Sequence, residues 1–209
     1  RLPVSLYITL LTCILTYVIA TCLAYCQFRL SRYQSSIQYT LACLSSLPTS
    51  LLFILCLYVV QPKIHANNIS QIPLAAILIS LKHLAKKTTL IYHFLIDAHH
   101  RPCITAAHQR LVPKHIILSC YILPHALAHA LATLPRHFAY TLLSGTLLAE
   151  ILFSIDGLGK LHVQALQQHD TPLIIACLVC YSLLITSSYL ISDIIQCRLN
   201  PHIQAPLSR

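Results

Sequence analysis

Glycine is scarce in this chain, with three glycines among 209 residues. All three lie between Gly145 and Gly159, in the last third of the sequence. Glycine occurs where a backbone must bend tightly or approach another chain segment closely. The stretch Gly145–Gly159 is therefore the place where we expect special backbone demands. So few glycines also exclude the phosphate-binding Gly-x-x-x-x-Gly-Lys-Ser/Thr loop, so we do not expect the chain itself to bind ATP in that way.

Charged residues are few as well. They make up 9% of the chain against 56% hydrophobic residues, and the mean hydropathy is +0.70, which excludes an ordinary soluble domain. The net charge is +9, but nucleic-acid binding requires a solvent-exposed basic face on a soluble domain, and this composition leaves no such domain. We therefore exclude nucleic-acid binding. Because one membrane crossing takes about 20 apolar residues, the chain has room for about five transmembrane helices. The predicted fold class is an all-α membrane protein.

Methionine is absent and the first residue is Arg1. We therefore expect the natural start of the protein to lie upstream. The first apolar stretch follows no charged segment with a cleavage site, so it is interpreted as a membrane span and not as a signal peptide.

Three apolar stretches have the length of simple membrane spans: Ser5–Cys26, Tyr39–Val60 and Pro172–Ile195. A further stretch, Ile72–Ile96, is interrupted by three lysines, which predicts a long helix that leaves the membrane into the cytoplasm.

The remaining apolar stretch, Ile116–Leu152, is too long for one crossing. As a straight helix it would measure about 55 Å. We expect it to begin in the cytoplasm and to break near Pro124 before it crosses.

The basic residues predict the orientation. Most of the fourteen lie in the loop around Arg29, in the region Lys82–Lys114 and in the C-terminal tail. The positive-inside rule places these segments in the cytoplasm, with the C-terminus, and leaves the visible N-terminus outside.

Histidine and cysteine are abundant, with 13 and 10 residues, but their spacing predicts no metal site. His125 and His129 share one helix face without a third ligand apparent from sequence, and Cys177 and Cys180 lie inside a span without a second pair. Most of the cysteines are interpreted as small hydrophobic residues. A His/Cys-rich membrane protein handling metal or haem remains an alternative.

Arg136 and His137 lie inside a predicted span, where ionisable groups are costly and commonly functional. They are candidates for the substrate path; pairing with a partner subunit, or a position nearer the interface, stays open. No Ser/His/Asp or Cys/His catalytic set is apparent, so we expect no catalytic residues and no enzyme activity.

The stretch containing the glycines resembles the signature of the dipeptide/oligopeptide family of ABC-transporter inner-membrane permeases. Further motifs with similar order and spacing occur around Asp170 and Asp193, and both ends of the chain also resemble this family. The nearest branch is that of the microcin C-type peptide permeases, and within it the B component. The segments that carry the resemblance are Arg1–Leu6, Thr88–Asp97, Glu150–Ser154, Asp156–Gly159, Gln168–Pro172, Ser192–Asp193 and Asn200–Ile203.

This resemblance implies a MetI-like permease core over residues 1–209, without the usual first helix and periplasmic segment. It implies a bacterial inner-membrane subunit that imports peptides or peptide-like solutes by alternating access. The implied partners are a second permease, two cytoplasmic ATPases that bind the ATP, and a periplasmic solute-binding protein, with no cofactor on this chain. The residues matching the family's periplasmic-turn motif are Gly145, Glu150, Phe153, Asp156, Gly157 and Gly159.

The resemblance also implies an ATPase-coupling helix in the cytoplasmic stretch Cys103–Lys114. Thr105, Ala106 and Leu111 match the family pattern, whereas Arg110 stands where the family has glycine. We expect Arg110 to be strained in a turn that suits glycine. A degenerate, non-transporting permease is therefore a second alternative.

Overall fold

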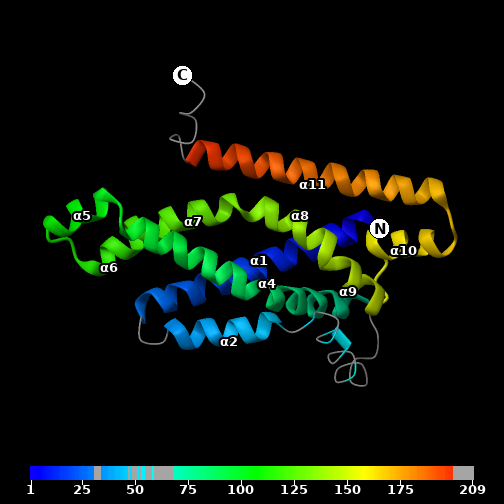
Figure 1. Ribbon diagram of the computed structural model, residues 1–209, viewed down its shortest axis with the longest axis horizontal. Helices are drawn as coiled ribbons and strands as arrows, with labels where there is room; N and C mark the ends of the chain where they lie inside the picture. Colours follow the sequence, from blue (N-terminus) through cyan, green and yellow to red (C-terminus); the bar gives the residue numbers. More distant parts are fainter. Residues whose placement is uncertain are drawn as a thin grey trace.

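The computed structural model describes residues 1–30, 34–46, 48, 51, 53, 54, 58 and 68–199. In these ranges every regular element is a helix, and the helices form one elongated bundle (Figure 1). In chain order they are α1 (Leu2–Arg29), α2 (Gln34–Ser46), α4 (Asn68–His99), α5 (Pro102–Gln109), α6 (Lys114–Ile116), the π-helix η2 (Ile117–Ile122), α7 (Leu123–Ala132), α8 (Leu134–Ser144), α9 (Thr146–Leu152), α10 (Leu158–Gln167) and α11 (Thr171–Leu199).

Three segments of the described chain are long and apolar enough to cross a membrane: Leu2–Arg29, Lys114–Ala132 and Thr171–Leu199. Helix α4 has 32 residues and runs without interruption through its lysines, as the sequence predicts. Nine of the 22 residues of the predicted span Tyr39–Val60 lie outside the described residues, all of them after the end of α2. Its crossing therefore stays a prediction.

The long apolar stretch Ile116–Leu152 is broken where proline and glycine stand. The break predicted near Pro124 does not form: Lys114–Ala132 is one continuous helix, in which the π-helical η2 passes into α7 with helical backbone angles at Ile122 and Leu123. The interruptions fall instead at Thr133, which precedes Pro135, and at Gly145. Proline is tolerated in the first turn of a helix, where its missing N–H has no intrahelical partner. The break predicted near Pro124 is therefore wrong, and the interruptions at Thr133 and Gly145 were not predicted.

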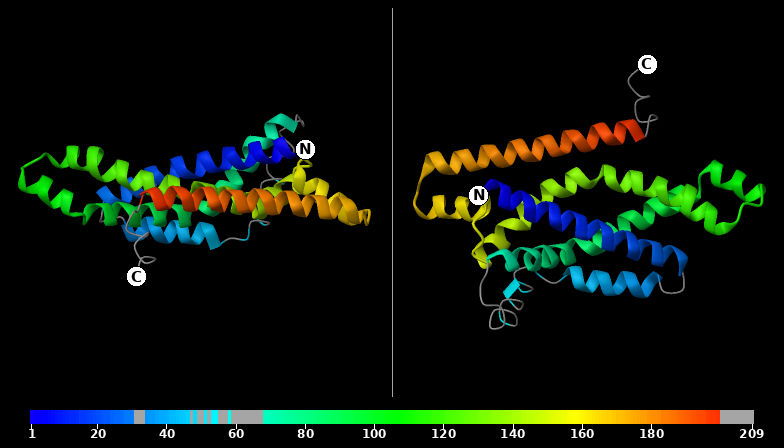
Figure 2. Two further views of the ribbon diagram at one scale, coloured as in Figure 1. Left: turned by 90° about the horizontal axis from the view of Figure 1, so that it is seen from above. Right: turned by 180° about the vertical axis from the view of Figure 1, so that it is seen from behind.

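The helices alternate in direction along the long axis of the bundle. Helices α1, α4 and α11 run one way, whereas α2 and the series α7–α9 return (Figures 1 and 2). One end of the bundle carries α5 and the C-terminal ends of α1, α4 and α11; the opposite end carries the N-terminus, α9 and α10 (Figure 2). A hydrogen bond from Arg1 Nη1 to Gln164 Oε1 (2.7 Å) ties the N-terminus to α10. This arrangement agrees with the predicted grouping of Arg29, Arg101, Arg110, Lys114 and Arg198, whereas Lys82, Lys86 and Lys87 lie near the middle of α4 and not at this end.

The core is built on the contact between α1 and α4, which lie side by side. Small residues on α1, Ala20 and Ala24, are fully buried beside Ile91 and Leu95 of α4. In a membrane, small residues at a helix interface let two backbones approach closely and gain packing contacts. Helix α11 lies at the edge of the bundle and leaves most of its apolar surface uncovered.

Three helices end in the same motif although the residues that close it are not glycine. Leu111, Ser154 and His169 have φ of 55°, 54° and 56°, in the left-handed region. In each case the next residue donates its N–H five positions back: Val112 to Ala107, Ile155 to Glu150 and Asp170 to Ala165. This is the Schellman motif, which usually places glycine at the left-handed position. None of the three glycines has a positive φ.

Candidate functional site

The predicted ATPase-coupling residues lie on an exposed helix at one end of the bundle. Thr105 and Ala106 of α5, and Arg110 and Leu111 just after it, are all exposed, and Leu111 is 89% exposed. The opposite side of α5 carries Ile104 and Ala107, which are buried in the main core cluster. The helix is therefore fixed to the bundle by one side and presents the candidate coupling residues on the other.

The expectation of strain at Arg110 is wrong. Arg110 has no positive φ; it precedes the left-handed position of the Schellman turn, and its N–H donates to the Ala106 carbonyl at 3.1 Å. The left-handed residue is Leu111, one position later. A non-glycine residue in this region costs about 1–2 kcal/mol. The unfavourable backbone geometry that the sequence analysis assigned to the arginine therefore belongs to the leucine.

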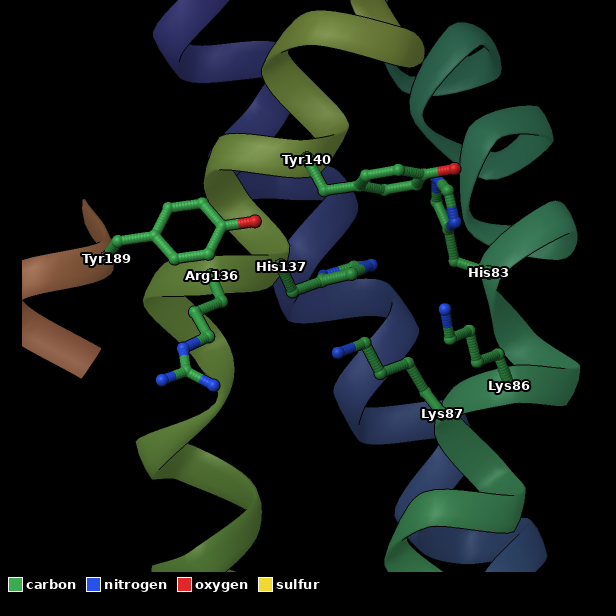
Figure 3. A pocket seen from close by; sticks show the side chains of 7 residues that line it. All are labelled: His83, Lys86, Lys87, Arg136, His137, Tyr140 and Tyr189. Carbon is green, nitrogen blue, oxygen red and sulfur yellow. The ribbon is translucent and has the colours of Figure 1, made fainter. Parts of the chain in front are cut away.

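Arg136 and His137 lie together in the wall of a cavity of about 190 Å³ (Figure 3). Both come from α8; the other walls are one side of α4, at about the middle of that helix, and Tyr189 of α11. Every lining side chain is basic or a tyrosine: His83, Lys86, Lys87, Arg136, His137, Tyr140 and Tyr189. The sequence predicted two of the seven residues. The others were missed because no spacing rule connects α4 with α8 before the fold is known.

His137 belongs to a network of buried polar groups behind the cavity. It is 3% exposed, and its Nδ1 lies 3.5 Å from Cys13 Sγ of α1. Its ring meets the His83 ring edge to face, with centroids 5.1 Å apart. Lys87 Nζ donates to the Tyr17 hydroxyl at 3.3 Å, and that hydroxyl lies 2.9 Å from Thr133 Oγ1. These contacts join α1, α4 and the α7–α8 junction behind the cavity.

Arg136 forms an ion pair with Asp193 of α11, and its guanidinium lies 5.8 Å from the Tyr189 ring centroid. This ion pair is a contact within the chain and joins α8 to α11 near the C-terminal end of α11. The neighbouring Ser192 is fully buried and donates to the Ala132 carbonyl at 2.7 Å. Adjacent residues thus hold α11 against α7 and α8.

At the other end of the bundle, the carboxylate of Glu150 caps the N-terminus of α10. Glu150 is fully buried; its Oε2 accepts the N–H groups of Gly159 (2.6 Å) and Lys160 (3.2 Å). Its Oε1 accepts the Ser5 hydroxyl at 2.5 Å, and Ser5 Oγ in turn accepts the Leu158 N–H at 2.7 Å. The first N–H groups of a helix lack intrahelical partners and favour negative charge. One acid and one serine therefore satisfy the first three N–H groups of α10.

Gly157 and Gly159 leave the space that the Glu150 carboxylate and the neighbouring backbone occupy. A Cβ at Gly157 would overlap the Glu150 carboxylate, and one at Gly159 would lie 2.9 Å from the Leu147 Cα atom. Phe153 is buried, with its ring 5.8 Å from that of Phe53, and exposed Asp156 pairs with Lys160 at 2.8 Å. The predicted motif residues are thus brought together, except Gly145, which lies at the α8–α9 junction against Ile79. Ser5 was missed as a member of this network.

The histidine pair of the alternative interpretation forms as its spacing predicts. His125 Nε2 and His129 Nε2 lie 3.2 Å apart on α7. Among the described residues there is no group of three or more His, Cys, Asp or Glu side chains that could hold a metal ion. The metal interpretation therefore gains no third ligand from this part of the chain.

The fold and these sites define a multi-pass, all-helical inner-membrane protein with an exposed short helix at one end and a carboxylate-capped turn at the other. Residues 8–205 match the family of binding-protein-dependent transport system inner membrane components, and the chain belongs to that family. The motif Asn200–Ile203 that contributed to the sequence resemblance lies outside the described residues.

Individual relatives are bacterial permeases. The chain is 28% identical over 130 residues to a peptidoglycan transport system permease protein YejB of Agrobacterium fabrum, and 27% over 119 residues to an inner membrane ABC transporter permease protein YejB of Escherichia coli O157:H7. It is 25% identical over 138 residues to a dipeptide transport system permease protein DppB of Lactococcus lactis subsp. cremoris. These alignments cover 62%, 57% and 66% of this chain but 36%, 33% and 45% of the relatives. The chain thus spans less than half the length of the curated relatives it matches.

Proposed function

We propose that this chain forms one half of the membrane channel of an ABC importer for peptides or peptide-like solutes. In this proposal it pairs with a second permease, two cytoplasmic ATPases and a solute-binding protein. ATP binding to the ATPases shifts the permease between inward-open and outward-open states, because the two states differ in their affinity for the closed ATPase pair. The chain contributes no catalytic chemistry of its own.

The observation that carries this proposal is the exposed outer side of α5 in a chain that belongs to the family. Its buried side packs with η2 and α7 in one core cluster, and the series continues through α7 to α8 and the cavity. A movement of α5 can therefore be transmitted through these packed helices to the wall of the cavity. The π-helix in this route is a common site of functional bending.

The orientation follows from the same elements. We place α5 and the C-terminal end of α11 in the cytoplasm, and the Glu150-capped turn on the outer side. The basic residues that gather at the α5 end support this, since cytoplasmic loops of membrane proteins are enriched in lysine and arginine. The alternative of a degenerate permease was based on expected backbone strain at Arg110. Arg110 is not in the left-handed conformation, so this argument no longer supports it.

Transport in a reconstituted system tests the proposal. The permease is placed in liposomes with its partner permease, ATPases and binding protein, and uptake of a labelled peptide is measured with and without internal or external ATP. Uptake that requires ATP on the α5 side and the binding protein on the other side is expected. Assembly without ATP-dependent uptake would favour the degenerate alternative, and bound metal without assembly would favour the metal-handling alternative.

A further inference from the structure

The cavity between α4, α8 and α11 carries positive charge that no acid of this chain balances. The chain has five acidic residues, and all five lie in the described ranges. Asp97 pairs with Arg101, Asp156 with Lys160 and Asp193 with Arg136; Glu150 caps α10, and Asp170 Oδ1 accepts the Leu173 N–H. No acid is therefore left for Lys86 or Lys87, and within the described residues neither forms an ion pair.

The cavity also contains a polar group without a partner. His83 is 6% exposed, and its Nε2 atom is buried and has no hydrogen-bond partner among the described residues. Lys87, one turn further along α4, donates to the neutral Tyr17 hydroxyl and lies 5.3 Å from the centre of that ring. Buried polar groups are normally hydrogen-bonded, and cations inside a membrane protein normally face a partner or a polar path. These two side chains therefore indicate a missing anionic group.

We propose that this cavity is a subsite for the carboxylate of the transported solute, with Lys87 and His83 as its principal contacts. The proposal rests on the proposed function and adds the chemistry that the channel recognises. Arg136, held by Asp193, fixes the far wall, and the rings of Tyr140 and Tyr189 border the cavity (Figure 3). An unpaired lysine ammonium favours a carboxylate over a neutral amide, because a charge-assisted hydrogen bond is about twice as strong as a neutral one.

The phosphate of an anionic lipid has the same charge and acceptor chemistry. The position of the cavity favours the solute. Its lysines lie near the middle of α4, far along the bundle from both the α5 end and the α10 end (Figure 1). Lipid phosphates lie at the two faces of the bilayer, outside the hydrocarbon core. A solute crossing the membrane passes through this depth.

The experiment measures direct binding of two probes to the permease pair in phosphatidylcholine nanodiscs, without ATPases or binding protein. The probes are N-acetyl-trialanine and its C-terminal amide, which differ by one carboxylate. We expect the acid to bind about tenfold to a hundredfold more tightly than the amide. Lys87→Gln should abolish this preference, Lys87→Arg should retain most of it, and Lys114→Gln on exposed α6 should leave it unchanged. Lys86 also lines the cavity and is exposed, so Lys86→Gln should weaken the preference without disturbing the packing, and it is the variant to use if Lys87→Gln does not fold.

Equal binding of the two probes to the native protein would overturn the proposal, and so would a preference that survives both lysine variants. A repeat in nanodiscs containing phosphatidylglycerol separates the two sources of the anion. If the anionic lipid removes the preference and Lys87→Gln releases lipid bound to the native protein, the cavity is a lipid site and the proposal fails. Because the assay needs no ATP hydrolysis, failure of the importer function would leave this result unaffected.

Discussion

Replacement of Gly157 by alanine provides a direct test of how the Glu150-capped turn is built. The backbone at Gly157 has φ −105° and ψ −172°, which alanine adopts without strain. The new Cβ, however, would overlap the Glu150 carboxylate, which is itself fixed by Ser5 and by two backbone N–H groups. The effect of the substitution is therefore steric, and it is transmitted to a buried charge.

The expected loss has two contributions. Overpacking in a well-packed region costs about 1–3 kcal/mol. Displacement of the carboxylate also weakens at least one hydrogen bond to a charged group, each of which contributes about 1.5–3 kcal/mol. We therefore expect Gly157→Ala to reduce the free energy of unfolding by about 2.5–6 kcal/mol. Such a change would greatly reduce the amount of folded protein.

Gly145→Ala is the matched control. Its Cβ would lie 2.7 Å from Cγ2 of the buried Ile79 and 3.0 Å from the Thr141 carbonyl oxygen, so it overpacks the core without displacing the carboxylate, and we expect only the overpacking loss of about 1–3 kcal/mol. The assay is thermal unfolding in detergent, followed with a thiol-reactive fluorophore after the exposed cysteines have been blocked, since the chain has no tryptophan and Cys13 and Cys177 are buried. Equal losses for the two variants would refute the steric role of the carboxylate.

Three further predictions concern single positions. Leu111→Gly should raise the unfolding temperature, because it removes about 1 kcal/mol of left-handed strain from a side chain with little packing to lose, whereas Arg110→Gly should not raise it. Ser192→Ala should destabilise the protein by about 1 kcal/mol, because it breaks the hydrogen bond from α11 to α7, while Ser187→Ala at an exposed position should cost less than half of that. The hydrogen bond and charge of its lysine partner lower the pKa of Asp156, so the stability from this pair is present at neutral pH and is lost as the pH falls below about 4. Unfolding curves of Asp156→Asn and the native protein should therefore differ at pH 7 and converge in acid; a constant difference would contradict the assignment.

The helical architecture could be predicted from the sequence, because a chain with the composition of a membrane protein has few alternatives to transmembrane helices. Long apolar stretches must form helices, since unpaired backbone groups are too costly in lipid. The uninterrupted course of α4 through its lysines followed from the same argument, whereas the break expected near Pro124 does not form because proline is tolerated in the first turn of α7. The interruption at Thr133 was missed because Pro135 in an otherwise apolar stretch has the same local signal as a tolerated kink.

The role of the glycines was predicted in part. Their clustering marked the right segment, but tight bending and close approach could not be distinguished from sequence. The structure shows close approach, with Glu150 as the group approached. The left-handed turns are instead formed by Leu111, Ser154 and His169, which carry no such signal in the sequence.

Contacts between distant segments were beyond the reach of the sequence. The bonds of Glu150 to Ser5 and of Arg136 to Asp193 join helices that are far apart in the chain. The cavity likewise combines lysines of α4 with residues of α8, and each set alone is compatible with a lipid-facing or interfacial position. Whether the α4 lysines and the α8 residues face each other depends on how each helix is rotated about its own axis. The nearly uniform apolar composition of the spans does not determine this rotation.

The measurement that tests the account most directly is solute-stimulated ATP hydrolysis by the reconstituted importer when a carboxylate is added to the outer side of α5. We predict that Ala106→Glu lowers the stimulation by at least about tenfold, because an unpaired charge in a docking interface costs more than about 1.4 kcal/mol. Gln167→Glu adds the same charge to an exposed position on α10, at the opposite end of the bundle, and should leave the stimulation unchanged. Undiminished stimulation in the Ala106 variant would show that α5 is not the coupling helix and would contradict the account.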